Sequence, residues 1–132
     1  MIKLNVMVIF ILTFISACAV TTPQTDNAQV SQTITDAELK LNQRIENKEC
    51  DGSFQCKILP IGQQPCGEPS RYVVYSTKHT ATEQAERMAA EITEFEKIYN
   101  QQSPALAGCQ SISIPQALCL NNTCQEYKLN TQ

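Results

Sequence analysis

The stretch RYVVYSTKHTATEQAERMAAEITEFEKIYN, residues 71–100, holds a strand followed by a long helix. Its first seven residues, 71–77, are mainly β-branched and aromatic, a composition typical of a strand. From residue 81, apolar side chains recur every three or four positions, which is the spacing of an amphipathic helix. These apolar positions are Ala81, Ala85, Met88, Ala89, Ile92, Phe95 and Tyr99. We therefore predict a strand over 71–77 and a helix over 81–101.

Two shorter elements are predicted upstream of this stretch. Four apolar residues there recur at helical spacing, which predicts a short amphipathic helix over 36–48. They are Ile34, Ala37, Leu41 and Ile45. The apolar run 57–61 contains Pro60, and proline restricts a strand to the edge of a sheet.

The C-terminal part of the chain predicts an extended segment near 110–114 and then a hairpin. Asn121-Asn122 can adopt the positive φ that a type I′ turn needs. That turn would place Cys119 opposite Cys124, within disulfide reach. The order of elements predicts a small disulfide-stapled α+β domain over 35–132, with one long amphipathic helix packed on a short antiparallel sheet.

The composition narrows the function classes. The chain has 132 residues, which suits one domain, and a net charge of −3, which disfavours binding to nucleic acid. It has no Trp and only 6% aromatic residues, yet it has seven cysteines. This cysteine content favours a disulfide framework in an oxidising compartment.

The N-terminus has the layout of a secretory signal peptide. Lys3 precedes an apolar run over 6–15, and the small residues Ser16 and Ala17 follow. A membrane-spanning helix needs roughly 18 apolar residues, so this run is too short to be one. A buried core helix is the alternative interpretation. We predict that residues 1–17 are the signal peptide.

The sequence ISAC, residues 15–18, resembles the lipobox of bacterial lipoproteins. This resemblance implies cleavage before Cys18, attachment of diacylglycerol to its thiol and acylation of the new amine. Ala19 stands where Asp would favour inner-membrane retention in Gram-negative members, so the resemblance implies the outer membrane. The alternative is ordinary cleavage at Ala17-Cys18-Ala19, which would release a soluble protein beginning at Val20.

Residues 18–34 are predicted to be the lipidated cysteine and a disordered tether. The segment is rich in Thr, Gln and Asn, and it shows no apolar period. An N-terminal strand is the alternative, but Pro23 and the polar run disfavour it.

The six other cysteines are predicted to form structural disulfides. They are Cys50, Cys56, Cys66, Cys109, Cys119 and Cys124. Six cysteines can pair in fifteen ways. We favour a Cys66–Cys109 bond, because it would tie together the two ends of the strand–helix unit; the other four cysteines would then form two bridges. Zinc binding, thioredoxin-like redox chemistry and a cysteine nucleophile are weaker alternatives, because C-x-x-C is missing and His79 is the only histidine. We predict no catalytic residue, cofactor or metal.

The segment CKILPIGQQPCGEPSRYVVYST, residues 56–77, also resembles uncharacterised secreted or lipid-anchored proteins of Gram-negative bacteria. In those proteins a C-x-x-x-x-x-G motif is followed by a C-G-G-P motif. An aromatic strand, a helix and further cysteines come after it in the chain. The matching residues here are Cys56, Gly62, Cys66, Gly67, Pro69 and Tyr72, and Glu68 replaces the second glycine of the motif. The resemblance implies an envelope protein and carries no activity.

These patterns predict a non-enzymatic lipoprotein of the cell envelope. Its partners would be the membrane, through Cys18, and another envelope protein. The alternative is an inhibitor of a protease or cell-wall hydrolase, in which the segment IGQQPCGEPSR, residues 61–71, would be the binding loop. An enzyme that uses His79 as its base is a third possibility.

Overall fold

The computed structural model describes residues 24–102 and 109–127 of the chain. The described part forms two helices, a short 3₁₀ helix and two two-stranded antiparallel sheets. These elements are α1 (Gln24–Arg44), η1 (Ser53–Gln55), β1 (Cys56–Ile61), β2 (Arg71–Ser76), α2 (Thr82–Gln102), β3 (Gln116–Leu120) and β4 (Thr123–Tyr127). The predicted α+β class is confirmed.

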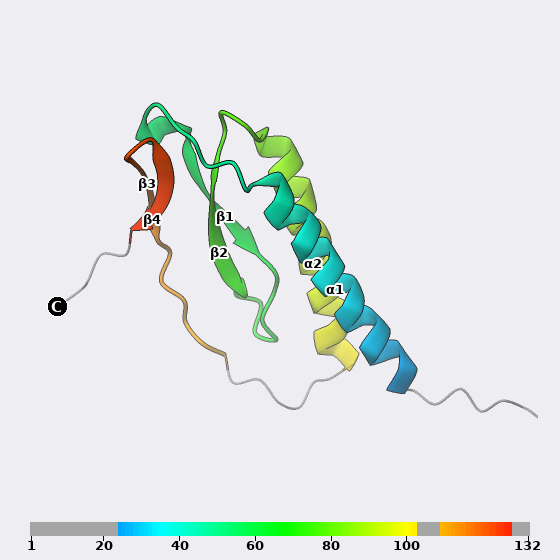
Figure 1. Ribbon diagram of the computed structural model, residues 1–132. Coiled ribbons are helices and arrows are strands. Elements are labelled where there is room, and N and C mark those ends of the chain that lie inside the picture. Colours follow the sequence, from blue (N-terminus) through cyan, green and yellow to red (C-terminus); the bar gives the residue numbers. More distant parts are fainter. Residues whose placement is uncertain (1–23, 103–108, 128–132) are drawn as a thin grey trace, which may run out of the picture.

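The elements stack as three layers. α1 and α2 run antiparallel beside each other on one face of the β1–β2 sheet, and the β3–β4 hairpin lies on its other side (Figure 1). β1 and β2 pair in a register that sets Ile58 opposite Val74 and Leu59 opposite Val73. Because successive side chains of a strand point to opposite faces, each strand contributes to both layers.

Apolar side chains, most of them aliphatic, fill the space between the helices and the sheet. Leu41 from α1, Ile92 from α2 and Tyr75 from β2 are among the most deeply buried residues of this core. The remaining members are Ala37, Ile45, Leu59, Ile61, Ala85 and Ala89. The α2 members of this core belong to the apolar stripe from which the long helix was predicted.

A second, smaller core lies between the sheet and the hairpin. Its buried members are Cys50, Cys56, Val74 and Cys124, and Ile58, Ala117 and Cys119 pack against them. Cysteine is the main residue type of this layer, so disulfides occupy the place that aliphatic side chains occupy on the helix side.

Several predicted elements are confirmed with shifts of one residue. α2 covers Thr82–Gln102, and the two strands of the sheet cover Cys56–Ile61 and Arg71–Ser76. The hairpin turn is also confirmed, since Asn121 and Asn122 have φ values of 51° and 59°. Cys119 faces Cys124 across it. The segment 110–114 belongs to no strand.

The N-terminal helix is longer than predicted. It begins at Gln24 and ends at Arg44, whereas the sequence predicted 36–48 and a disordered tether over 18–34. Within the described residues the tether prediction is wrong, because 24–34 is helical; residues 18–23 lie outside them. Contacts with α2 explain the extension: Val30 and Thr33 line a groove with Phe95, and Ile34 packs against the core. In the part of the chain that the structure describes, neither helix could span a membrane.

Candidate functional site

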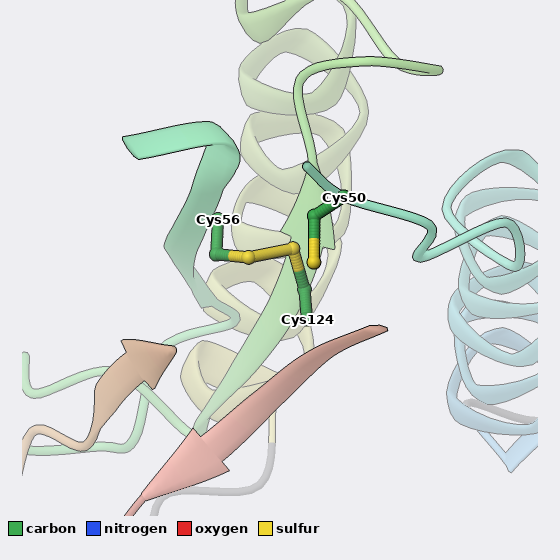
Figure 2. A group of neighbouring side chains, drawn as sticks. All are labelled: Cys50, Cys56 and Cys124. Atoms are coloured by element: carbon green, nitrogen blue, oxygen red, sulfur yellow. A yellow bond between two sulfur atoms is a disulfide. The ribbon is translucent and has the colours of Figure 1, made fainter. Parts of the chain in front are cut away.

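Two disulfides lie next to each other between the sheet and the hairpin. Cys50 is bonded to Cys119, and Cys56 is bonded to Cys124. The sulfur atoms of Cys50, Cys56 and Cys124 all lie within 4.8 Å of one another (Figure 2). Zinc is bound by thiolates, so sulfurs held in disulfides do not supply its ligands.

The six predicted disulfide cysteines pair completely. The third bond joins Cys66 to Cys109, the pair that the sequence favoured. The hairpin cysteines do not bond to each other, although Cys119 and Cys124 are cross-strand neighbours. Each bonds instead to a cysteine more than 60 residues away, with separations of 69 and 68 residues. Cys18, the predicted lipidation site, lies outside the described residues.

The predicted binding loop, residues 61–71, connects β1 and β2 at the far end of the sheet from the paired disulfides. We call it the 61–71 loop. The carboxylate of Glu96 on α2 holds both of its sides: it accepts a hydrogen bond of 2.8 Å from the backbone N–H of Gln63 and another from the hydroxyl of Ser70. Gly62 has a φ of +73°, and a Cβ atom there would overlap this carboxylate. Glycine at position 62 therefore permits both the positive φ of the turn and the close approach of Glu96.

Other contacts fix the loop to its surroundings. The side chain of Gln64 donates to the carbonyl of Pro69 at 3.0 Å and to that of Gln110 at 2.9 Å. Its carbonyl accepts a bond of 2.9 Å from the backbone N–H of Gln110. Asn100 of α2 donates to the carbonyl of Gln63 at 2.6 Å. Together with the Cys66–Cys109 bond, these contacts tie the loop to both α2 and the segment after it.

The base of the loop carries an ion-pair network. Arg71 lies at the start of β2 on the helix side, where its guanidinium is 2.7 Å from a carboxylate oxygen of Glu38 on α1. Another of its nitrogens is 3.7 Å from Glu96. Arg71 thereby joins both helices to the loop.

The tip of the loop points into solvent. Its four residues Pro65–Glu68 are exposed, in contrast to the half-buried or buried residues on either side. The loop therefore combines fixed flanks with an accessible tip, and a loop already held in one conformation has little conformational entropy left to lose.

His79 and a group of charged residues lie at the opposite end of the sheet. The ammonium of Lys78 lies 2.8 Å from Glu49 and 2.9 Å from Asp51. Hydrogen bonds from Lys78 hold the pKa of Glu49 and of Asp51 below their usual values, and the same bonds raise the pKa of Lys78. His79 Nε2 is 3.5 Å from a Glu49 oxygen, without hydrogen-bond geometry. All six cysteines in the described chain are in disulfides, so none offers His79 a thiol nucleophile.

Sequence reasoning identified the loop but missed the residues that hold it. Glu96 borders the apolar stripe of α2, and its side chain is only 16% exposed. An acidic residue at the edge of a buried stripe signals an internal polar partner, because a carboxylate removed from water needs hydrogen bonds. Gln64 and Arg71 gave no comparable signal, because the partners that tie them to other elements lie on segments distant in sequence.

Comparison with known proteins adds no relative: no protein family, curated protein or solved structure matches this chain. The three disulfides themselves indicate a location outside the cytoplasm, in a cell envelope or secreted.

Proposed function

We propose that this chain is a non-enzymatic, lipid-anchored envelope protein whose domain binds another envelope component through the 61–71 loop. The observation that carries the proposal is the contrast within that loop. Its flanks are held by hydrogen bonds from Glu96 and Gln64, whereas its tip is exposed and is tied to the rest of the chain by the Cys66–Cys109 bond. A loop already held in one conformation loses little entropy on binding.

The anchor would bring this loop close to a membrane. Helix α1 begins at Gln24, six residues after the predicted lipidation site Cys18, and six residues reach at most about 20 Å. The loop lies toward the same end of the helix pair as the start of α1 (Figure 1). A partner at the membrane surface therefore fits the loop's position.

The arrangement of reactive groups supports a non-enzymatic role. His79 lies at the end of the sheet opposite the 61–71 loop, beside Glu49 and away from the exposed tip. The described cysteines are all bonded to each other. A binding function needs only the rigid loop.

Charge reversal on the loop tests the binding proposal. The full chain is used to capture partners from envelope fractions, and the Glu68→Lys variant is compared with Glu46→Lys. Both residues are exposed glutamates, but Glu46 follows α1 at the opposite end of the domain. We expect Glu68→Lys to lose a partner that the wild type and Glu46→Lys retain. Equal capture by all three proteins would contradict the role of the loop.

Intact mass of the membrane-extracted protein tests the anchor. A mature chain that begins at a diacylated or triacylated Cys18 is expected, and Cys18→Ser should leave the membrane fraction. An unlipidated chain that begins at Val20 would overturn the anchor without affecting the binding proposal.

The rigid loop also favours a second candidate function, inhibition of a protease or cell-wall hydrolase. Such inhibitors present a fixed loop to an active site, and the disulfide at Cys66 lies at the exposed tip. A panel of proteases and lysozymes tests this function. No inhibition at micromolar concentration would rule it out for the enzymes of the panel.

A further inference from the structure

The two adjacent disulfides form a reactive arrangement that the proposed binding function does not use. The Cys50 sulfur, which belongs to one bridge, lies within 4.8 Å of both sulfurs of the other bridge, Cys56 and Cys124. In Figure 2 the Cys50 sulfur lies on the Cys124 side of that second bond. Thiol–disulfide exchange requires a thiolate beside a disulfide sulfur, and opening of the Cys50–Cys119 bond would produce this pairing.

Backbone contacts hold Cys50 in place beside β4. Its N–H donates to the carbonyl of Asn122 at 3.0 Å, and the N–H of Cys124 donates to the carbonyl of Lys48 at 2.8 Å. These bonds do not involve the disulfide, so they can keep Cys50 near Cys124 after its own bridge opens. A nucleophile fixed near its target reacts much faster than one that is free in solution.

The four cysteines of the two bridges differ in their exposure to solvent. Cys50, Cys56 and Cys124 are buried, with exposures of 0%, 6% and 2%. Cys119 on β3 is half-buried and is the most exposed of these four residues, so we take its sulfur as the one that an external thiol attacks. Attack at Cys119 releases Cys50 as the leaving group, inside the cluster.

We propose that the two bridges form a disulfide-exchange centre, in which an external dithiol opens Cys50–Cys119 and the second bridge then migrates to Cys50–Cys124. The dithiol attacks Cys119 to give a mixed disulfide and a Cys50 thiolate. Its second thiol then closes the reagent's own disulfide and releases Cys119 as a thiol, so the reagent supplies both electrons. The Cys50 thiolate attacks Cys124, the Cys56–Cys124 bond breaks, and Cys56 leaves as a thiolate that takes a proton from water.

This migration changes which segments are joined. The β3–β4 hairpin stays attached to the segment after α1 through Cys50–Cys124, whereas β1 loses its covalent link to the hairpin. The product holds thiols at Cys56 and Cys119. The centre therefore takes up two electrons while the hairpin remains tethered.

Partial reduction of the full-length oxidised chain tests the proposal. The protein is treated with limiting dithiothreitol, quenched with acid after different delays, alkylated and mapped by peptide mass spectrometry. We expect the singly reduced cluster to carry label on Cys56 and Cys119 with a Cys50–Cys124 bridge, at a fraction that grows with the delay. Label that stays on Cys50 and Cys119 at every delay would overturn the proposal, and a Cys50–Cys56 bridge would overturn the assignment of Cys124 as the attacked sulfur.

A pair of variants gives a matched comparison. Cys119→Ser leaves Cys50 unpaired from the start, and we expect the label to appear on Cys56 instead of Cys50. Cys109→Ser leaves Cys66 unpaired in the 61–71 loop at the other end of the sheet, where the label should stay on Cys66. If Cys119→Ser does not fold, partial reduction of the wild type decides alone.

Discussion

The two faces of the β1–β2 sheet are held by different means. Facing the helices, Leu41, Tyr75 and Ile92 belong to a continuous core of buried apolar side chains. Facing the hairpin, the buried set is small and three of its four members are cysteines. The same two strands thus serve one layer stabilised mainly by burial and another stabilised mainly by covalent bonds.

This difference reflects the amount of apolar surface that each layer can offer. Each helix is 21 residues long and has an apolar side that faces the core, whereas β3 and β4 have five residues each, most of them polar or exposed. A two-stranded hairpin alone is marginally stable in water. The disulfides compensate for this by restricting the unfolded chain.

Removal of a hairpin bridge is expected to have the largest effect. The Cys56→Ala/Cys124→Ala variant loses a bond between residues 68 apart, which should cost about 4 kcal/mol of unfolding free energy in the chain-entropy description. Hydrogen exchange should show greater loss of protection in β3 and β4 than in α1 and α2. Urea denaturation with exchange mass spectrometry measures both quantities.

The third bridge supplies the control for this experiment. Cys66→Ala/Cys109→Ala also removes a long-range bond, with a separation of 43 residues, but that bond lies at the 61–71 loop. This variant should lose a similar amount of unfolding free energy. The protection of β3 and β4 relative to that of α1 and α2 should stay unchanged. Uniform loss of protection in both variants would show that the two layers unfold as one unit.

A cavity in the helix-side core is expected to have the next largest effect. Ile92 is fully buried, so Ile92→Ala should cost about 3 kcal/mol. Ile98 on the same helix is 41% exposed, and Ile98→Ala should cost less than about 1 kcal/mol. Chemical denaturation of both variants measures the difference. Equal costs would mean that burial against the sheet is not what stabilises this layer.

The helix-side layer was the more predictable of the two. Its pattern is local, since the apolar residues of α2 recur at a fixed period and the strand 71–77 has a distinctive composition. The first half of α1 was missed because only Val30 and Ile34 mark its apolar side, and contact with α2 supplies what the local sequence lacks.

The hairpin layer was predicted only in part. The turn at Asn121-Asn122 follows from local chemistry, and the register that sets Cys119 opposite Cys124 follows from that turn. The bonds from these cysteines to Cys50 and Cys56 depend on how the hairpin docks, which no local pattern encodes. The contacts that hold the 61–71 loop were missed for the same reason. The sequence of the loop was distinctive, but Glu96, which accepts the hydrogen bond of Ser70, lies 26 residues further along the chain.

Loss of the Glu96 carboxylate should have an intermediate effect. Glu96→Ala leaves the N–H of Gln63 and the hydroxyl of Ser70 without their acceptor, which should cost about 2 kcal/mol. Glu94→Ala on the same helix is the control: its side chain is 66% exposed, and its cost should be near zero. Urea denaturation measures the costs, and hydrogen exchange of Gln63 reports whether the loop is released. A similar loss of unfolding free energy in both variants would contradict the role of Glu96 in holding the 61–71 loop.

The ion pairs around Lys78 should have the smallest effect, and it should depend on pH. They brace the segment that carries Cys50, but Glu49 and Asp51 are 54% and 60% exposed, so solvent screens them. The pKa of each carboxyl lies below its ordinary value of 4.5 or 3.8 because Lys78 donates a hydrogen bond to it. The stability from these pairs is therefore present above those values and is lost as pH falls through the lowered pKa values. At the alkaline end it is present below 10.5, the ordinary pKa of lysine, and is lost as pH rises through the raised pKa of Lys78.

Lys78→Met should thus lower the thermal midpoint slightly at neutral pH and make no difference at pH 2. The matched control is Lys57→Met, because Lys57 is exposed and makes no ion pair within the described residues. Its midpoint should follow the wild type at both pH values. A deficit of Lys78→Met that persists at pH 2 would assign the effect to packing of the lysine side chain instead of its charge, and the segment carrying Cys50 would then depend on its disulfide and backbone bonds alone.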